Sequence, residues 1–149
     1  MSSEIKNADS FERILDNLAG GFDNKDKIFA NEAGAKVFVE TMKPKIPYRS
    51  KLRNVHGHAE KSHLRDSLIE VKHSNGSVHV GFTSKGEKGY IGRFLNDGWD
   101  VKDKNGETHS HVAGLDFWGD TQRDAKGKVG ATVAAVLKEE MDKKVRDVK

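Results

Sequence analysis

Several residue types and patterns are missing from this chain, and each absence excludes a class of protein. There is no cysteine, so a disulfide framework, a thiolate metal site and a cysteine nucleophile are all excluded. No apolar run approaches the roughly 20 residues that span a bilayer. Residues 1–6 lack the basic and then apolar pattern of a signal peptide. We therefore expect a soluble protein that is made inside the cell and has no membrane partner.

Catalytic fingerprints are missing as well. The sequence contains no Gly-x-Ser-x-Gly elbow, no phosphate-binding glycine loop with its Lys and no dinucleotide-binding motif. Gly86 and Gly89 form a Gly-rich turn, but we predict no helix after it. These absences favour a protein that is not an enzyme and that uses no cofactor.

Basic and acidic residues are nearly balanced. Lys and Arg number 26 and Asp and Glu 23, and no block of five or six like charges occurs. A protein that reads DNA usually concentrates its cations on one face. The densest basic stretch is interrupted by both prolines, Pro44 and Pro47, so we interpret it as a solvated loop, with phosphate contact as the alternative. Its cations are Lys43, Lys45, Arg49, Lys51 and Arg53.

The length of 149 residues fits one domain, which buries roughly two thirds of the surface that the unfolded chain exposes. Only 35% of the residues are hydrophobic and 33% are charged, which is compatible with a partner that covers part of the apolar surface. We find no repeat and no linker. We therefore predict a single domain over residues 1–149, with residues 1–22 as an N-terminal helical extension and 24–145 as the main body.

Two helices are predicted in the first third of the chain. Residues 10–19 place apolar side chains at i, i+3, i+4 and i+7 behind a Ser N-cap. A second helix is predicted from Asn24 to Lys43, because two prolines follow it. Its small residues Gly34 and Ala35 suit close packing against a sheet or a neighbour.

A β-hairpin is the clearest local prediction. Leu68–His73 and Ser77–Thr83 are rich in β-branched residues, and Asn75-Gly76 between them is a preferred tight-turn dipeptide. A third strand is predicted over Tyr90–Leu95, which completes a small antiparallel sheet. Polar residues 48–62 are predicted to form a loop.

The C-terminal part completes an α+β pattern. Residues 100–112 are charged and polar, and we predict that they are exposed, either as the tip of a hairpin or as a flexible loop. A long helix is predicted from about Asp120 to Val145, and Gly127 and Gly130 within it indicate a bend or a close approach to another backbone. The order of helices, strands and a final helix predicts an α+β domain with a long helix on each side of the sheet.

The aromatic residues near the last two predicted elements are interpreted as core. Tyr90, Phe94 and Trp99 lie in and after the third predicted strand, while Phe117 and Trp118 precede the last helix. Together they are expected to pin that helix onto the sheet. The alternative is that one Trp lies in a subunit interface.

Two histidine pairs raise a metal hypothesis. His56 and His58, and His109 and His111, are spaced i and i+2, and imidazole is a common ligand for zinc, copper or nickel. No third ligand has a fixed position, and structural zinc motifs have stricter spacing. We therefore favour exposed loop histidines over a metal site.

Asp66, Glu70 and Lys72 form an Asp-x-x-x-Glu-x-Lys string, which metal-dependent nucleases use to hold magnesium and position water. Such strings are frequent by chance in a highly charged chain. We interpret Glu70 and Lys72 as an ion pair on the outer face of the strand, and a nuclease stays the alternative function.

Five segments, taken in order, resemble the gene-ten-like family of tailed-phage proteins, which are described as minor tail, tail-completion or neck proteins. The resemblance covers about residues 25–145. An extra segment, Lys51–His63, and an altered approach to the last helix depart from the family pattern. The segments are Glu32–Val37, Ile46–Ser50, Leu64–Leu68, Val80–Gly81 with Tyr90–Gly98, and Ala113–Phe117.

The resemblance implies a structural virion protein that is made in the host cytoplasm and placed at the head–tail junction. It implies a homo-oligomeric ring of roughly six or twelve copies, between a head-closure or connector protein and the tail terminator or tail tube protein, with double-stranded DNA passing through. It carries no catalytic residues, and a non-phage oligomeric adaptor stays an alternative to this role. The expected interface residues, on the two polar loops and at the two tryptophans, are Arg49, Lys51, Arg53, His56, His58, Trp99, Lys102, Lys104, His109, His111 and Trp118.

Overall fold

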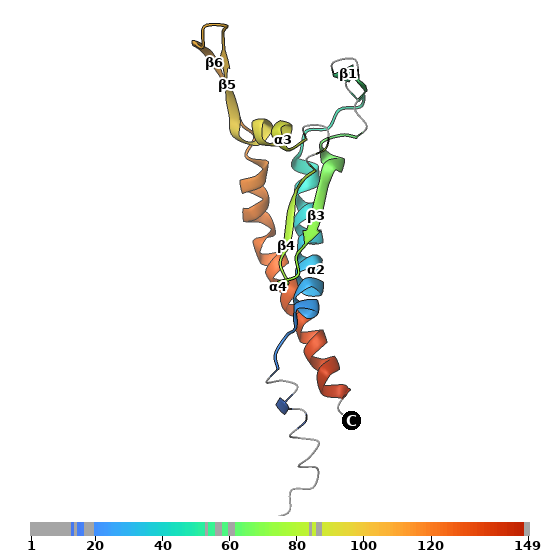
Figure 1. The fold of residues 1–149 in the computed structure, drawn as a ribbon. Helices are drawn as coiled ribbons and strands as arrows, with labels where there is room; N and C mark the ends of the chain where they lie inside the picture. Colours follow the sequence, from blue (N-terminus) through green and yellow to red (C-terminus); the bar gives the residue numbers. More distant parts are fainter. Residues whose placement is uncertain are drawn as a thin grey trace, which may run out of the picture.

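Two long helices form the body of the molecule. The computed structural model describes residues 13, 15–16, 20–52, 54–55, 58–59, 62–83, 85 and 88–147. Helices α2 (Asn24–Met42) and α4 (Phe117–Arg146) lie side by side along an elongated molecule (Figure 1). No helix in these described ranges is both long and apolar enough to cross a membrane.

Three antiparallel hairpins complete the fold, which confirms the α+β class. Within the described residues each sheet has two strands. The hairpins and the remaining short elements are β1 (Asn54–Val55) with β2 (His58–Ala59), β3 (Leu68–Lys72) with β4 (Val78–Phe82), β5 (Gly98–Lys102) with β6 (Thr108–Ala113), the helix α3 (Lys88–Asp97), and the 3-10 turns η1 (Lys43–Lys45) and η2 (Arg65–Ser67). The segment predicted as a plain loop therefore contains the short β1–β2 pair.

The predicted second helix is confirmed almost to the residue. Asp23 caps α2 through a capping box: its carboxylate accepts from the Asp26 amide at 2.8 Å, and its own amide donates to the Asp26 carboxylate at 3.1 Å. The helix ends where Pro44 enters η1. The helix predicted over residues 10–19 falls outside the described part of the chain, except for residues 13, 15 and 16, which are helical.

Small residues bring α2 and α4 into close contact, as their sequence predicts. A Cβ added to Gly34 would lie 2.7 Å from a methyl group of Val133 and 3.2 Å from one of Val129. Ala30 and Ala125 are also buried. For Gly127 and Gly130 of α4 a bend or a close approach to another backbone was expected, and the structure shows no close approach within the described chain, because a Cβ at either position would meet nothing within 4 Å.

The predicted hairpin is confirmed as β3–β4. Its register runs from Leu68 opposite Phe82 to Lys72 opposite Val78, and Gly76 adopts φ +93° in the turn. Helix α2 holds this turn, because the Asn31 side chain donates to the Gly76 carbonyl at 2.8 Å. The hairpin therefore lies along α2.

The third predicted strand is wrong, because its residues form α3. Ile91 and Leu95 are spaced i and i+4 and pack against the core from one side of this helix. Gly92 allows the approach, since a Cβ there would lie 2.5 Å from the Phe82 ring. A helix thus follows the Gly-rich turn, contrary to the expectation from the sequence.

The core lies where α2, β4, α3 and α4 meet. Met42, Ile46, Leu64 and Phe117 form its buried centre, and Trp118 packs against it, which confirms the expectation for the two aromatics at the start of α4. The expectation for the other three is wrong. Tyr90, Phe94 and Trp99 are 69%, 49% and 37% exposed and are not part of the core cluster.

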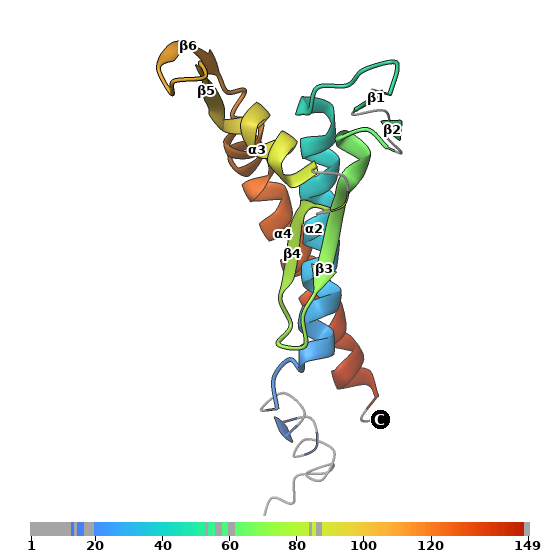
Figure 2. The ribbon, with the colours of Figure 1, turned by 45° about the horizontal axis from the view of Figure 1, so that its top comes forward.

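One end of the molecule carries the two smaller hairpins. Figure 2 shows β5–β6 and β1–β2 on either side of α3 at this end, with the start of α2 and the C-terminus at the other. Residues 100–112 therefore form a hairpin tip, which was one of the two forms expected. At the opposite end the Lys144 ammonium binds the Asp26 carboxylate at 2.6 Å and ties α4 to α2.

Candidate interaction surface

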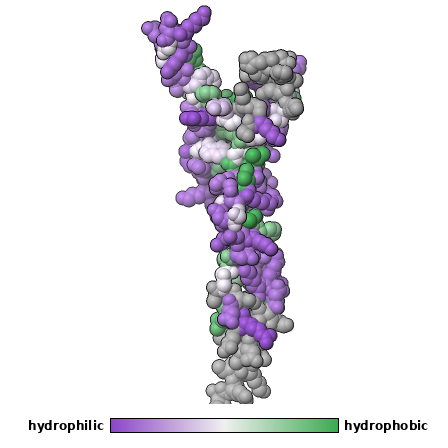
Figure 3. Space-filling model, in the orientation of Figure 1, coloured by the Kyte–Doolittle hydropathy of each residue, from purple (hydrophilic) through white to green (hydrophobic). Residues whose placement is uncertain are grey.

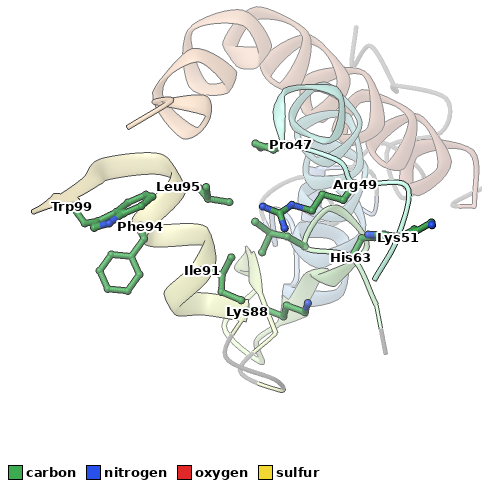
Figure 4. A pocket seen from close by; sticks show the side chains of 10 residues that line it. Pro47, Arg49, Lys51, His63, Lys88, Ile91, Phe94, Leu95 and Trp99 are labelled. Carbon is green, nitrogen blue, oxygen red and sulfur yellow. The ribbon is translucent and has the colours of Figure 1, made fainter. Parts of the chain in front are cut away.

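A cavity of about 440 Å³ opens between α3 and the segment that follows α2 (Figure 4). Ile91 and Leu95 line it from α3, and Leu64 and Pro47 line it from the opposite side. Trp99 of β5 closes one end, where its ring makes an edge contact with Phe94, with 6.2 Å between ring centroids. We call this cavity the α3 cleft.

The wall opposite α3 is fixed by local packing. Ile46 is 1% exposed, and its carbonyl accepts a hydrogen bond of 3.0 Å from the Arg65 guanidinium. The same guanidinium lies over the Tyr48 ring, 4.8 Å from its centroid, and Tyr48 contacts the His63 ring. These contacts hold the segment around Pro47 in place, so the cleft is a preformed feature.

The α3 cleft has a basic lining. Arg49, Lys51 and His63 line it opposite α3 and the buried Lys88 lines it from α3, and no carboxylate is among the described residues that do. Figure 4 shows the Arg49 side chain reaching toward α3. Arg49 and Lys51 form no ion pair with any described residue.

The tip of β5–β6 carries two His–Asp pairs. His111 Nδ1 lies 2.7 Å from Asp100 Oδ1, and His109 Nε2 lies 3.2 Å from Asp103 Oδ2. The pKa of Asp103 is lowered, first by the hydrogen bond from the Glu107 amide and then by His109 and neighbouring amides. Each histidine therefore has a carboxylate partner within its own hairpin.

The metal hypothesis gains no support in the described part of the chain. No three His, Asp or Glu side chains there are grouped so that they could hold a metal ion. His56 lies outside the described residues, and the side chain of His58 in β2 is not described. The two histidine pairs are therefore not brought together by anything that the structure describes.

The nuclease string is divided between two elements. Asp66 lies in η2, whereas Glu70 and Lys72 lie on β3. The predicted Glu70–Lys72 ion pair is wrong. Lys72 instead binds Glu32 of α2 at 2.8 Å and lowers the pKa of the Glu32 carboxyl group. Lys72 can reach Glu32 because alternate residues of β3, Leu68, Glu70 and Lys72, lie on the face of the strand toward α2.

The predicted interface residues lie in different parts of the molecule. Arg49, Lys51 and Trp99 come together at the α3 cleft, while Trp118 packs against the core between Phe38 and Phe82, with ring centroids 5.7 and 6.1 Å away. Arg53 and His56 lie outside the described residues, and the side chain of His58 is not described. The remaining four, on the exposed β5–β6 hairpin, are Lys102, Lys104, His109 and His111.

A second surface, which the sequence did not indicate, lies on β3. Ile69 and Val71 are 42% and 43% exposed, on the side of the strand turned away from α2. We call this pair the outer β3 face. Figure 3 shows hydrophobic atoms over the β3–β4 hairpin within a mainly hydrophilic surface. The available signal was the alternation of Ile69 and Val71 with Glu70 and Lys72 in β3, which places the two apolar side chains on one face of the strand.

The described part of the chain has a small core. Seven hydrophobic residues in it are buried, while many large apolar side chains are exposed. Such a surface is typical of a subunit that is completed by contacts with other chains.

Comparison with known protein families gives a match. A family model described as "Bacteriophage HK97-gp10, putative tail-component" matches residues 9–98, which is more than half of the chain. The match includes α2, the β3–β4 hairpin and α3, and ends at the first residue of β5. No curated protein and no solved structure matches the chain. The protein therefore belongs to the HK97-gp10-like tail-component family of bacteriophages.

Proposed function

We propose that this tail component is a non-enzymatic ring subunit at the head–tail junction of a long-tailed phage. In this proposal several copies form a closed ring that joins the connector to the tail tube and surrounds the path of the DNA. Membership in the family supports a role in the tail. The near balance of charge suits a channel through which DNA slides without being captured.

The observation that carries the proposal is that the β3–β4 hairpin is apolar on both faces. Leu68 and Phe82 pack against the core from the inner face, whereas Ile69 and Val71 are exposed on the outer one. Within the described residues this sheet has only two strands, and the exposure of Ile69 and Val71 shows that its outer face is left partly open. A neighbouring copy in a ring would cover the outer β3 face, since a heterologous contact repeats until the rotation closes.

Phage particles assembled with a variant subunit test this proposal. Val71→Glu places a charge on the outer β3 face, and we expect it to reduce incorporation of the subunit into virions at least about tenfold, since burying an unpaired carboxylate is costly. Gln122→Glu, which adds the same charge at an exposed position of α4, is the matched control and should be incorporated normally.

Folding must be checked separately. Circular dichroism and urea unfolding of purified Val71→Glu should match the wild type, because Val71 is already 43% exposed in the single chain. A folded Val71→Glu protein that enters virions as well as the control does would contradict the proposal.

A further inference from the structure

The α3 cleft combines apolar side chains with unpaired positive charge. Ile91 and Leu95 of α3 and Leu64 across from them are apolar, and Arg49 and Lys51 lie on the wall opposite α3. Several cations elsewhere in the chain pair with carboxylates within the chain: Lys72 binds Glu32, and Lys144 binds Asp26. In a chain with 23 acidic residues, cations left without a carboxylate beside an apolar cavity indicate that the carboxylate comes from another molecule.

The size and lining of the cleft favour a protein ligand. A volume of about 440 Å³ accommodates one or two large side chains, which places it at the small end of ordinary ligand pockets. Aliphatic side chains such as Ile91 and Leu95 favour binding of an apolar group, because its surface is removed from water, but they form no favourable contact with a phosphate. The planar guanidinium of Arg49 suits a carboxylate, which it can bind through two parallel hydrogen bonds.

The position of the cleft also favours a partner at one end of the molecule. The cleft lies between α3 and the segment after α2, at the end that carries the β5–β6 and β1–β2 hairpins (Figures 2 and 4). The outer β3 face runs along the side of the molecule instead. A contact at the cleft is therefore distinct from the proposed contact between neighbouring copies.

We propose that the α3 cleft binds a peptide segment of a partner protein in which a large apolar side chain is flanked by acidic residues. The apolar side chain enters between Ile91 and Leu95, and the acidic residues pair with Arg49 and Lys51. This inference rests on the proposed function only for the identity of the partner. In a ring at the head–tail junction, the partner would be the protein that lies next to the ring at this end of the subunit.

Direct binding to purified full-length protein tests the inference. The probe is a fluorescently labelled hexapeptide, Glu-Asp-Phe-Leu-Asp-Glu, measured by fluorescence polarisation. Two matched peptides serve as controls. Lys-Lys-Phe-Leu-Lys-Lys lacks the acidic residues, and Glu-Asp-Gly-Ser-Asp-Glu lacks the apolar residues. We expect the first peptide to bind at least about tenfold more tightly than either control, since charge and apolar contact each contribute more than about 1.4 kcal/mol.

Variants of the cleft locate the binding. Arg49→Glu should weaken binding of the acidic apolar peptide at least about tenfold. Lys126→Glu, with the same change at an exposed position of α4, should leave it unchanged. Trp99→Ala removes an exposed wall of the cleft and should also weaken binding, while circular dichroism confirms that each variant is folded.

Three results would overturn the inference: no binding of the acidic apolar peptide up to about 1 mM, equal binding of all three peptides, or binding that Arg49→Glu does not change. Tighter binding of a single-stranded DNA oligonucleotide at the same residues would also overturn it and assign the cleft to nucleic acid. None of these results involves the outer β3 face, so failure here leaves ring formation to be judged by the Val71→Glu experiment.

Discussion

Two glycines in similar helical settings have opposite roles. A Cβ at Gly34 would lie 2.7 Å from Val133, whereas a Cβ at Gly127 meets nothing within 4 Å. We expect Gly127→Ala to raise the free energy of unfolding by about 0.5–1 kcal/mol through helix propensity. Gly34→Ala should lower it, because overpacking costs about 1–3 kcal/mol. Urea unfolding measures both, and an equal stabilisation by the two substitutions would show that α2 and α4 are not in close contact.

The Asp26–Lys144 pair makes stability depend on pH. The hydrogen bond from Lys144 lowers the pKa of Asp26 and raises that of Lys144. Because the folded pKa of Asp26 lies below its unfolded value, the stabilisation is present above about pH 4 and is lost as the pH falls through the lowered pKa. On the Lys144 side it is lost only above about pH 10.

Lys144→Met tests this pair. We expect a lower Tm than the wild type at pH 7, and a smaller difference at about pH 3, because the stabilisation begins to be lost below the unfolded pKa of Asp26, about 3.9. Lys126→Met removes an exposed cation of α4 that pairs with no described residue, so it should change Tm little at either pH. A Tm difference for Lys144→Met that stays the same at both pH values would contradict the role assigned to the pair.

At the scale of elements, α4 begins with an unusual cap. Asp116 adopts φ +46° and makes no capping hydrogen bond with its side chain. Asn96 at the end of α3 replaces it, since its side-chain oxygen accepts from the Trp118 amide at 2.8 Å and its carbonyl accepts from the Asp116 amide at 3.0 Å. One residue thus joins α3 to the start of α4.

We expect Asn96→Ala to cost about 0.5–2 kcal/mol of stability, the usual effect of losing a helix cap. Asn105→Ala, at the exposed tip of β5–β6, is the matched control and should have little effect. Chemical denaturation measures both variants. Equal stabilities for the two would mean that the Asn96 side chain does not cap α4.

The elements also show which features the sequence could predict. Local signals were sufficient for α2, with its cap and prolines, and for β3–β4, with Asn75-Gly76 in its turn. They were insufficient for α3, because its residues Tyr90–Leu95 are aromatic and apolar enough to resemble a strand. The deciding contact, Gly92 against the Phe82 ring, is a tertiary one.

The candidate surface was predicted only in part, for the same physical reason. Arg49, Lys51 and Trp99 could be proposed as interface residues from their types and from the family resemblance. That they share one cleft depends on α3 packing beside the segment after α2, which no local pattern specifies. Trp118 was assigned to an interface, but it lies against the core, because the aromatic residues of α2 and β4 surround it.

At the scale of the whole molecule, an elongated chain with a small core and a hairpin apolar on both faces is best explained as one subunit of a larger assembly. The molecule has two separate surfaces for contacts: the outer β3 face along the side, proposed to meet another copy, and the α3 cleft at one end, proposed to meet a different protein.

The most direct test is electron cryomicroscopy of the head–tail junction in virions that contain this protein. We predict a closed ring of copies at the junction, with Ile69 and Val71 of each copy buried against its neighbour. A chain located elsewhere in the particle, or a ring in which the outer β3 face remains exposed to solvent, would contradict the account.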